Sequence, residues 1–230
     1  MKRNDFTSDD TFGGPWTDDK LNIIQKYLSA YTIALKKWSF KKVYIDAFAG
    51  SGGINIKEDD GSLRQIKGSV SRAISIERPF DIYYFVELNK GKADLLVNIQ
   101  KEHPKMDIRT INGDANLEIP KIIRNIKGMN AKGVIFLDPY NTNVEWNTIH
   151  EIGTCGCLDF WYLFPLSAFT RMLPKNGEVP EEWKSKISNL CGCNDNIWFN
   201  KFYQRKKTYQ MSLFDQDRNH HLKKQLMLMT

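Results

Sequence analysis

Near its start the chain alternates apolar and polar positions with the period of an α-helix. Apolar side chains recur at steps of three and four residues from position 16 to 38: Leu21, Ile24, Leu28, Tyr31, Leu35 and Trp38. This spacing places them on one face and predicts an amphipathic helix over 16–38. Thr17 or Asp18 is the expected N-cap, because their side chains accept from free backbone N–H groups.

Further along, short and nearly continuous apolar runs alternate with helix-like segments. The runs predict strands at 42–48, 81–89, 106–114, 131–140 and 158–166. Helices are predicted at 68–77, 90–103, 117–126 and 144–153, whereas 53–66 is polar and turn-rich and is expected to form a loop. Apolar strands that alternate with helices are typical of a parallel sheet covered on both faces. We therefore expect an α/β fold with a doubly wound, mostly parallel, Rossmann-like sheet.

After Pro165 the strand pattern stops, and helical or loop-like sequence follows. We expect a sheet that lacks or shortens its last edge strands, with an exposed edge that a partner could cover. The length of 230 residues suits one sizeable domain. The expected division is a flexible arm (1–15), a Rossmann-like domain with its N-terminal helix (16–170), and a helical, basic C-terminal extension (171–230).

Composition places the chain among globular proteins, with 41% hydrophobic and 26% charged residues. No apolar run approaches the roughly eighteen residues of a membrane span. The first residues also lack the apolar core of a signal peptide. We expect a cytoplasmic protein that does not bind membranes.

The net charge is +6, and the basic excess lies largely in the C-terminal third. It gathers at Arg205, Lys206, Lys207, Lys223 and Lys224. Such a cluster permits contact with nucleic-acid phosphates but is equally typical of a solvated face, so nucleic acid is one candidate partner.

The four cysteines form two Cys-Gly-Cys pairs, Cys155/Cys157 and Cys191/Cys193. Zinc knuckles usually place two residues between their ligands, so the single glycine is a poor match. We predict no metal site and interpret these residues as buried or incidental thiols.

The stretch YIDAFAGSGG (44–53) joins a strand to a glycine-bearing turn. It lacks the Gly-Lys-Ser/Thr of a P-loop. It also lacks the G-x-G-x-x-G spacing and the helix start that dinucleotide phosphates need. S-adenosylmethionine (SAM) has no phosphate, and its methionine part needs only close backbone approach and an acid for the ammonium.

Acids end three successive predicted strands: Asp46, Glu87 and Asp114. In a parallel sheet these ends share one edge, where ligands bind. Asp46 would meet the ammonium, Glu87 the two ribose hydroxyls, and Asp114 the adenine amine. Three acids in this arrangement behind a glycine turn favour SAM as the cofactor.

The fourth strand ends in FLDPYN (136–141), beside the glycine turn. Methyltransferases that act on exocyclic amines of bases often carry Asp/Asn/Ser-Pro-Pro-aromatic here, where the acid accepts from the amine and the ring stacks. Asp138, Pro139 and Tyr140 match this turn without the second proline. We take these three as the catalytic candidates; a simple strand-ending turn is the alternative.

Five separated blocks resemble the three-Cys-motif partner (TcmP) family. In order between Gly13 and Ser167 they are GGPWTDDKLNIIQKYLSAY, YIDAFAGSG, FVELN, FLDPYN with VEW, and DFWYLFPL. The family looks like class I SAM-dependent methyltransferases, so the resemblance implies that fold and SAM as cofactor. It also implies a partner with a three-cysteine motif, of iron–sulfur or radical-SAM-like type.

Carried onto this chain, the family's motifs mark one set of residues. The cofactor set is Asp46, Phe48, Gly50, Ser51, Gly52 and Glu87, and the catalytic set is Asp138, Pro139 and Tyr140. Asp114 is assigned from class I methyltransferases in general. Trp16 and Lys20 are expected to lie over the cofactor as lid residues, with a hydrophobic staple as the alternative for Trp16.

Two functions follow as hypotheses. The first is a SAM-dependent methyltransferase whose acceptor is a nucleic-acid base or another amine. The second is a SAM-binding but non-catalytic module that acts with the three-Cys-motif partner.

Overall fold

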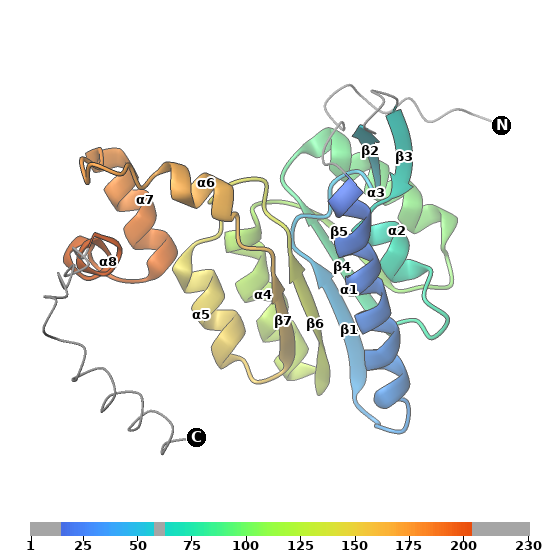
Figure 1. The fold of residues 1–230 in the computed structure, drawn as a ribbon. Helices are drawn as coiled ribbons and strands as arrows, with labels where there is room; N and C mark the ends of the chain where they lie inside the picture. The colour runs from blue at the N-terminus through green and yellow to red at the C-terminus, as the bar shows by residue number, and fades with distance from the viewer. Residues whose placement is uncertain (1–14, 58–62, 204–230) are drawn as a thin grey trace, which may run out of the picture. The chain divides into compact units, whose positions relative to one another are not determined.

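The computed structural model describes residues 15–57 and 63–203 (Figure 1). By internal contacts the chain divides into two units, 1–193 and 194–230. The first contains the sheet and all but one of the described helices. The second contains α8 (Asp195–Phe202), whose N-cap Asn194 accepts from the Ile197 N–H.

A five-stranded parallel sheet forms the centre of the first unit, in the order β5-β4-β1-β6-β7. The strands are β1 (Lys41–Asp46), β4 (Ile82–Glu87), β5 (Ile108–Asn112), β6 (Ala131–Leu137) and β7 (Leu158–Tyr162). All five predicted strands are present, each one to four residues shorter than its apolar run. The predicted doubly wound, Rossmann-like sheet is confirmed.

Helices cover both faces of this sheet. On one face α1 (Pro15–Ala34), α2 (Ser69–Ile74) and α3 (Lys90–Glu102) pack on Tyr44, Tyr83 and Phe85. On the other, α4 (Ala115–Gly128) and α5 (Trp146–Thr154) pack on the alternate residues, among them Val43 and Ile45. Figure 1 shows α1 and α2 lying together on their side of the sheet.

The chain changes direction across the sheet between β1 and β6. After β1 it runs outward to β4 and β5, and it then returns to add β6 and β7 on the other side. The carboxyl ends of β1 and β6 therefore flank a topological switch point, where α/β sheets of this kind bind ligands.

Two local predictions are wrong. The first helix begins at Pro15 and ends at Ala34, so Thr17 and Asp18 lie in its first turn and are not its N-cap. Segment 53–66 contains an antiparallel hairpin, β2 (Gly53–Lys57) and β3 (Leu63–Lys67), where a loop was predicted. The alternation of isoleucine with polar residues in GINIK fits a strand, but the polar residues obscured it.

After β7, the described chain to residue 203 is helical. It contains α6 (Leu166–Arg171), α7 (Glu181–Cys191) and α8, and no further strand. The prediction of missing edge strands and a helical C-terminal region therefore holds over these residues. The predicted arm (apart from Pro15) and the basic cluster at 205–224 lie outside the described residues. No helix within 15–57 and 63–203 has the length and apolarity to traverse a bilayer.

Candidate functional site

The glycine turn is anchored between its two neighbouring strands. The Ala47 N–H donates to Phe136 of β6, and the Ala49 N–H donates to Val86 of β4. Gly50 and Gly52 have φ of +61° and +85°, in the region that side chains disfavour. A Cβ at Gly52 would lie 2.5 Å from the Ile99 side chain, whereas one at Gly50 would meet nothing within 4 Å. The backbone at Gly52 is therefore packed against Ile99, whereas the backbone at Gly50 faces open space.

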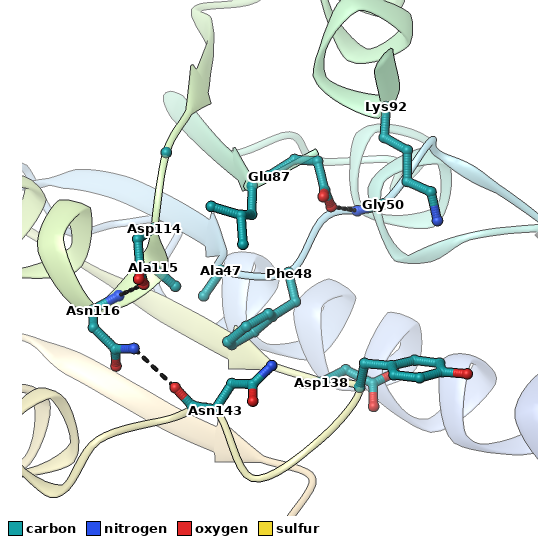
Figure 2. A pocket seen from close by; sticks show the side chains of 13 residues that line it. Ala47, Phe48, Gly50, Glu87, Lys92, Asp114, Ala115, Asn116, Asp138 and Asn143 are labelled. Atoms are coloured by element: carbon teal, nitrogen blue, oxygen red, sulfur yellow. Dashed lines mark hydrogen bonds between the residues drawn. The ribbon is translucent and has the colours of Figure 1, made fainter. Parts of the chain in front are cut away.

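Above this turn lies a hollow of about 620 Å³ (Figure 2). It is lined by Ala47, Phe48, Gly50, Glu87, Leu88, Lys92, Gly113, Asp114, Ala115, Asn116, Asp138, Tyr140 and Asn143. These residues come from the carboxyl ends of β1, β4, β5 and β6. Figure 2 shows Phe48 between Glu87 and Asp138. The volume is that of a drug-sized or nucleoside-sized ligand site.

Glu87 forms the wall beside the glycine turn. Its Oε2 accepts from the Gly50 N–H at 2.9 Å, and its Oε1 accepts from the Asn89 N–H at 2.8 Å. These bonds fix the carboxylate at the edge of the hollow. Each oxygen keeps a further lone pair, so the group can still accept from a ligand diol.

Asp114 follows β5 and caps α4. Its Oδ1 accepts from the Asn116 N–H at 2.8 Å. Asn116 in turn holds the loop before α5: its Nδ2 donates to the Asn143 carbonyl at 2.8 Å, and its Oδ1 accepts from Glu145 and Thr148. In Figure 2 this network runs from Asp114 and Asn116 along the hollow to Asn143, which lies on the side nearer Asp138.

Asp138 follows β6 and pairs with a lysine from the N-terminal helix. Lys20 Nζ lies 2.6 Å from Asp138 Oδ2, and both side chains are only partly exposed. Pro139 is buried, whereas Tyr140 is 67% exposed at the rim of the hollow. The turn therefore presents a carboxylate with one oxygen bridged to Lys20 and an accessible aromatic ring.

Several side-chain contacts join helix α1 to the body. Besides the Lys20–Asp138 pair, the buried Arg72 pairs with Asp18 and donates to Asn22. The Tyr27 hydroxyl donates to Asp159 at the start of β7. These contacts hold α1 against the body, and Lys20 reaches the hollow through its pair with Asp138, although it is not itself among the lining residues. The lid role expected for Lys20 stays a prediction. The side chain of Trp16 lies outside the described part.

Asp46 is fully buried beneath the turn and does not line the hollow. Its Oδ1 accepts from the Phe48 N–H at 3.3 Å, and its Oδ2 has no partner within the described residues. The pKa of Asp46 is raised to about 7, mainly by burial: hydrogen bonds from Ser69 and the Phe48 N–H act against the rise, and the nearby Asp138 and Glu87 carboxylates contribute to it. A direct contact with a ligand ammonium would require this carboxyl to be uncovered.

Six of the ten predicted site residues line one hollow. They are Phe48, Gly50, Glu87, Asp114, Asp138 and Tyr140. Asp46, Ser51, Gly52 and Pro139 lie behind its surface and shape the turns. Sequence reasoning missed Lys92, Asn116 and Asn143, which also line the hollow. Their place in the sequence could have identified two of them, because Lys92 and Asn116 lie in the first turns of the helices that follow β4 and β5.

The cysteines lie elsewhere. Cys155 and Cys157 precede β7, at the amino end of the sheet and away from the hollow. Burial raises the pKa of Cys157 to about 11, and the neighbouring Cys155 adds to the rise. Over the residues that the structure describes, no group of three or more His, Cys, Asp or Glu side chains could hold a metal ion.

Comparison with known proteins gives similarities of fold. No family model matches the sequence, and no curated protein matches it either. Among solved structures, a Legionella pneumophila protein assigned to DUF519 is 16% identical, with a TM-score of 0.49 over 76% of this chain and 74% of that one.

Two further structures are more distant. The Escherichia coli protein yhhF, provisionally described as a methyltransferase, is 18% identical, with a TM-score of 0.39 over 65% of this chain and 66% of that one. A conserved hypothetical protein of Streptococcus pyogenes is 18% identical, with a TM-score of 0.34 over 57% of this chain and 69% of that one. The strand order itself, with its reversal between β1 and β6, makes the fold Rossmann-like.

Proposed function

We propose that the protein is a SAM-dependent methyltransferase whose acceptor is a nucleic-acid base or another amine. One observation carries this proposal. Carboxylates from the ends of adjacent strands, Glu87 and Asp114, share a single hollow with the glycine turn and with Asp138. The resemblance of the sequence to the TcmP family supports the same cofactor.

The lining residues suit the parts of SAM in order. Glu87 would accept from the ribose hydroxyls, because its carboxylate is held at the wall with lone pairs to spare. Asp114 and Asn116 would meet the adenine, and the open side of Gly50 would let the methionine part approach the backbone. When bound, SAM supplies an electrophilic methyl group on its sulfonium.

The chain's own contribution to the reaction is positioning. Asp138 Oδ1, which is not the oxygen bridged to Lys20, would accept from the acceptor amine and orient its lone pair. The exposed ring of Tyr140 offers a stacking face for a planar acceptor. The proton lost from the amine would pass to solvent, because Asp138 is partly exposed.

A second candidate is a SAM-binding module that does not transfer methyl groups and acts with a three-Cys-motif partner. The ion pair between Lys20 and Asp138 favours it, since it occupies one oxygen of the only acid in the catalytic turn. The single proline in that turn is a second departure from the amine-methyltransferase pattern. A cytoplasmic location accords with either candidate and stays a prediction.

The test has two stages. Calorimetry with SAM and with its demethylated product, S-adenosylhomocysteine, should give binding that Glu87→Ala and Asp114→Ala abolish and that the surface control Glu151→Ala leaves unchanged. Labelled SAM is then incubated with DNA, RNA and protein pools, with and without the partner. Label that enters one pool and is lost with Asp138→Ala supports the enzyme. Tight binding without label in any pool favours the module, and absence of binding contradicts both.

A further inference from the structure

At the opposite edge of the sheet, where the strands begin, basic and aromatic side chains gather. The members, which we call the amino-edge surface, are Lys36, Lys37, Trp38, Phe40, Lys41, Lys42, Arg78 and Lys132. They come from the segment joining α1 to β1, from the first residues of β1 and β6, and from the turn before β4. The register pairs Lys42 directly with Lys132 on neighbouring strands.

Two aromatic rings stand among these cations. Trp38 is 62% exposed, and its ring centroid lies 5.9 Å from that of Phe40. The ammonium groups of Lys42 and Lys132 lie 5.9 Å and 5.7 Å from the Phe40 centroid. The Phe40 ring therefore holds two lysines close together beside an accessible indole.

Members of this surface line two hollows. One hollow of about 350 Å³ is lined by Tyr31, Ala34, Leu35, Trp38, Phe40, Lys132 and Asp159. A second, also of about 350 Å³, is lined by Thr32, Lys36, Lys42, Glu77, Arg78 and Pro79. A flexible chain could lie across both, with its planar groups in the first and its charges over the second.

The positive charge of this surface is only partly balanced by nearby acids. None of its six cations forms an ion pair with another residue of the described chain. Four carboxylates border the surface, Glu77, Asp81, Asp107 and Asp159, so its six cations exceed the nearby acids by two. The unmatched charge calls for an anionic partner.

We propose that the amino-edge surface binds single-stranded nucleic acid. Cations spaced around an exposed aromatic ring suit a strand whose phosphates meet the lysines while one base stacks on Trp38. A duplex has its bases already stacked and would leave the indole unused. An anionic membrane would match the charge but would bury several apolar side chains, whereas Trp38 is the one exposed apolar side chain among the eight members of this surface.

This inference does not depend on methyl transfer. β1 runs six residues from Lys41 to Asp46, so roughly 20 Å separate the amino-edge surface from the hollow. The surface would hold a nucleic acid by a region other than the one that reaches the hollow. RNA and DNA offer the same phosphates and stacking faces, so the test must compare them.

The experiment measures fluorescence anisotropy of labelled oligo(U), oligo(dT) and a blunt DNA duplex with the full chain over a range of salt. Trp38→Ala should weaken binding of both single strands about tenfold. The double variant Lys42→Gln/Lys132→Gln should lower the slope of log affinity against log salt by about 1.4, the contribution of two phosphate contacts. Its control is Lys121→Gln/Lys186→Gln, which removes the same charge from lysines paired with Glu118 and Glu182.

Single strands bound in preference to the duplex, with losses only in the amino-edge variants, would support the proposal. A preference for oligo(U) would identify RNA, and a preference for oligo(dT) would identify DNA. Equal binding by the wild type and every variant would overturn it. Binding to phosphatidylserine vesicles that Trp38→Ala abolishes, without binding to either oligonucleotide, would also overturn it and point to a membrane surface.

Discussion

The carboxyl ends and the amino ends of the strands in the same sheet, here called its carboxyl and amino edges, carry side chains of opposite charge. At the carboxyl edge, Glu87, Asp114 and Asp138 surround a hollow above a glycine turn. At the amino edge, lysines and an exposed tryptophan form a shallow surface without such a turn. Parallel strands bring every strand end of one kind together, so short loops of different composition become two coherent surfaces. The fold supplies the grouping, and the loop residues supply the chemistry.

The largest effect should come from the pH dependence of Asp46. In the unfolded chain this carboxyl titrates near its ordinary pKa of 3.8, whereas burial raises the pKa to about 7 in the folded protein. Its contribution to stability is therefore complete below about pH 4 and is lost as the pH rises towards 7. The loss amounts to at most roughly 4 kcal/mol over this interval.

Asp46→Asn should remove that slope, because the amide cannot ionise and still accepts from Phe48. Urea unfolding at about pH 5 and about pH 8 measures the difference. Lys41→Gln, at the other end of the same strand, serves as control and should leave the slope unchanged. An equal pH slope in the wild type and in Asp46→Asn would show that Asp46 is ionised in the folded state.

The next effect concerns turnover. Asp138→Ala should reduce methyl transfer about a hundredfold or more, since it removes the group that orients the acceptor. Asp138→Asn should lose less, because an amide oxygen can accept the same bond. Labelled-SAM assays at saturating acceptor measure this. Lys132→Gln, at the amino end of β6, should leave the saturated rate unchanged. A comparable loss in this variant would contradict the assignment of methyl transfer to the carboxyl edge alone.

A smaller effect separates two glycines of the turn. Gly52→Ala should destabilise the protein by about 2–3 kcal/mol, because a Cβ there adds a clash with Ile99 to an unfavourable φ. Gly50→Ala should cost only about 1 kcal/mol, since its Cβ would face open space. Denaturant midpoints of the two variants provide the comparison. Equal costs would mean that the turn adjusts its packing beneath Gly52.

The smallest effect tests Lys92, which lies at the glycine-turn end of the hollow in Figure 2. If it meets the carboxylate of the methionine part, Lys92→Met should weaken S-adenosylhomocysteine binding about tenfold, as expected for one exposed charge-assisted bond. Methylthioadenosine, which lacks that carboxylate, should bind both proteins equally. Lys36→Met at the amino edge is the matched control. Equal losses for both ligands would assign Lys92 a structural role.

Much of the fold could be predicted from the sequence, because buried parallel strands leave continuous apolar runs and the helices between them keep their own period. The hairpin at β2 and β3 escaped prediction, since its many polar residues resemble a loop. The first helix cap was misplaced because Thr17 is buried and Asp18 pairs with Arg72, and tertiary contacts decide both.

The grouping of the strand-end acids could also be predicted from the sequence, as Glu87 and Asp114 do line one hollow. The contacts that surround these acids could not be predicted. The Lys20–Asp138 pair joins residues 118 positions apart, so no local sequence pattern predicts it. The burial of Asp46 depends on how the turn folds over the end of β1. The amino-edge surface likewise arises only when β1 and β6 set Lys42 beside Lys132.

Whether the hollow binds this nucleoside is tested most directly by calorimetric titration of S-adenosylhomocysteine into three proteins: the wild type, Glu87→Ala and Lys132→Gln. We expect one binding site in the wild type, the same affinity in Lys132→Gln and no measurable binding in Glu87→Ala, with all three folded by circular dichroism. Unchanged binding in Glu87→Ala, or none in the wild type, would contradict this expectation.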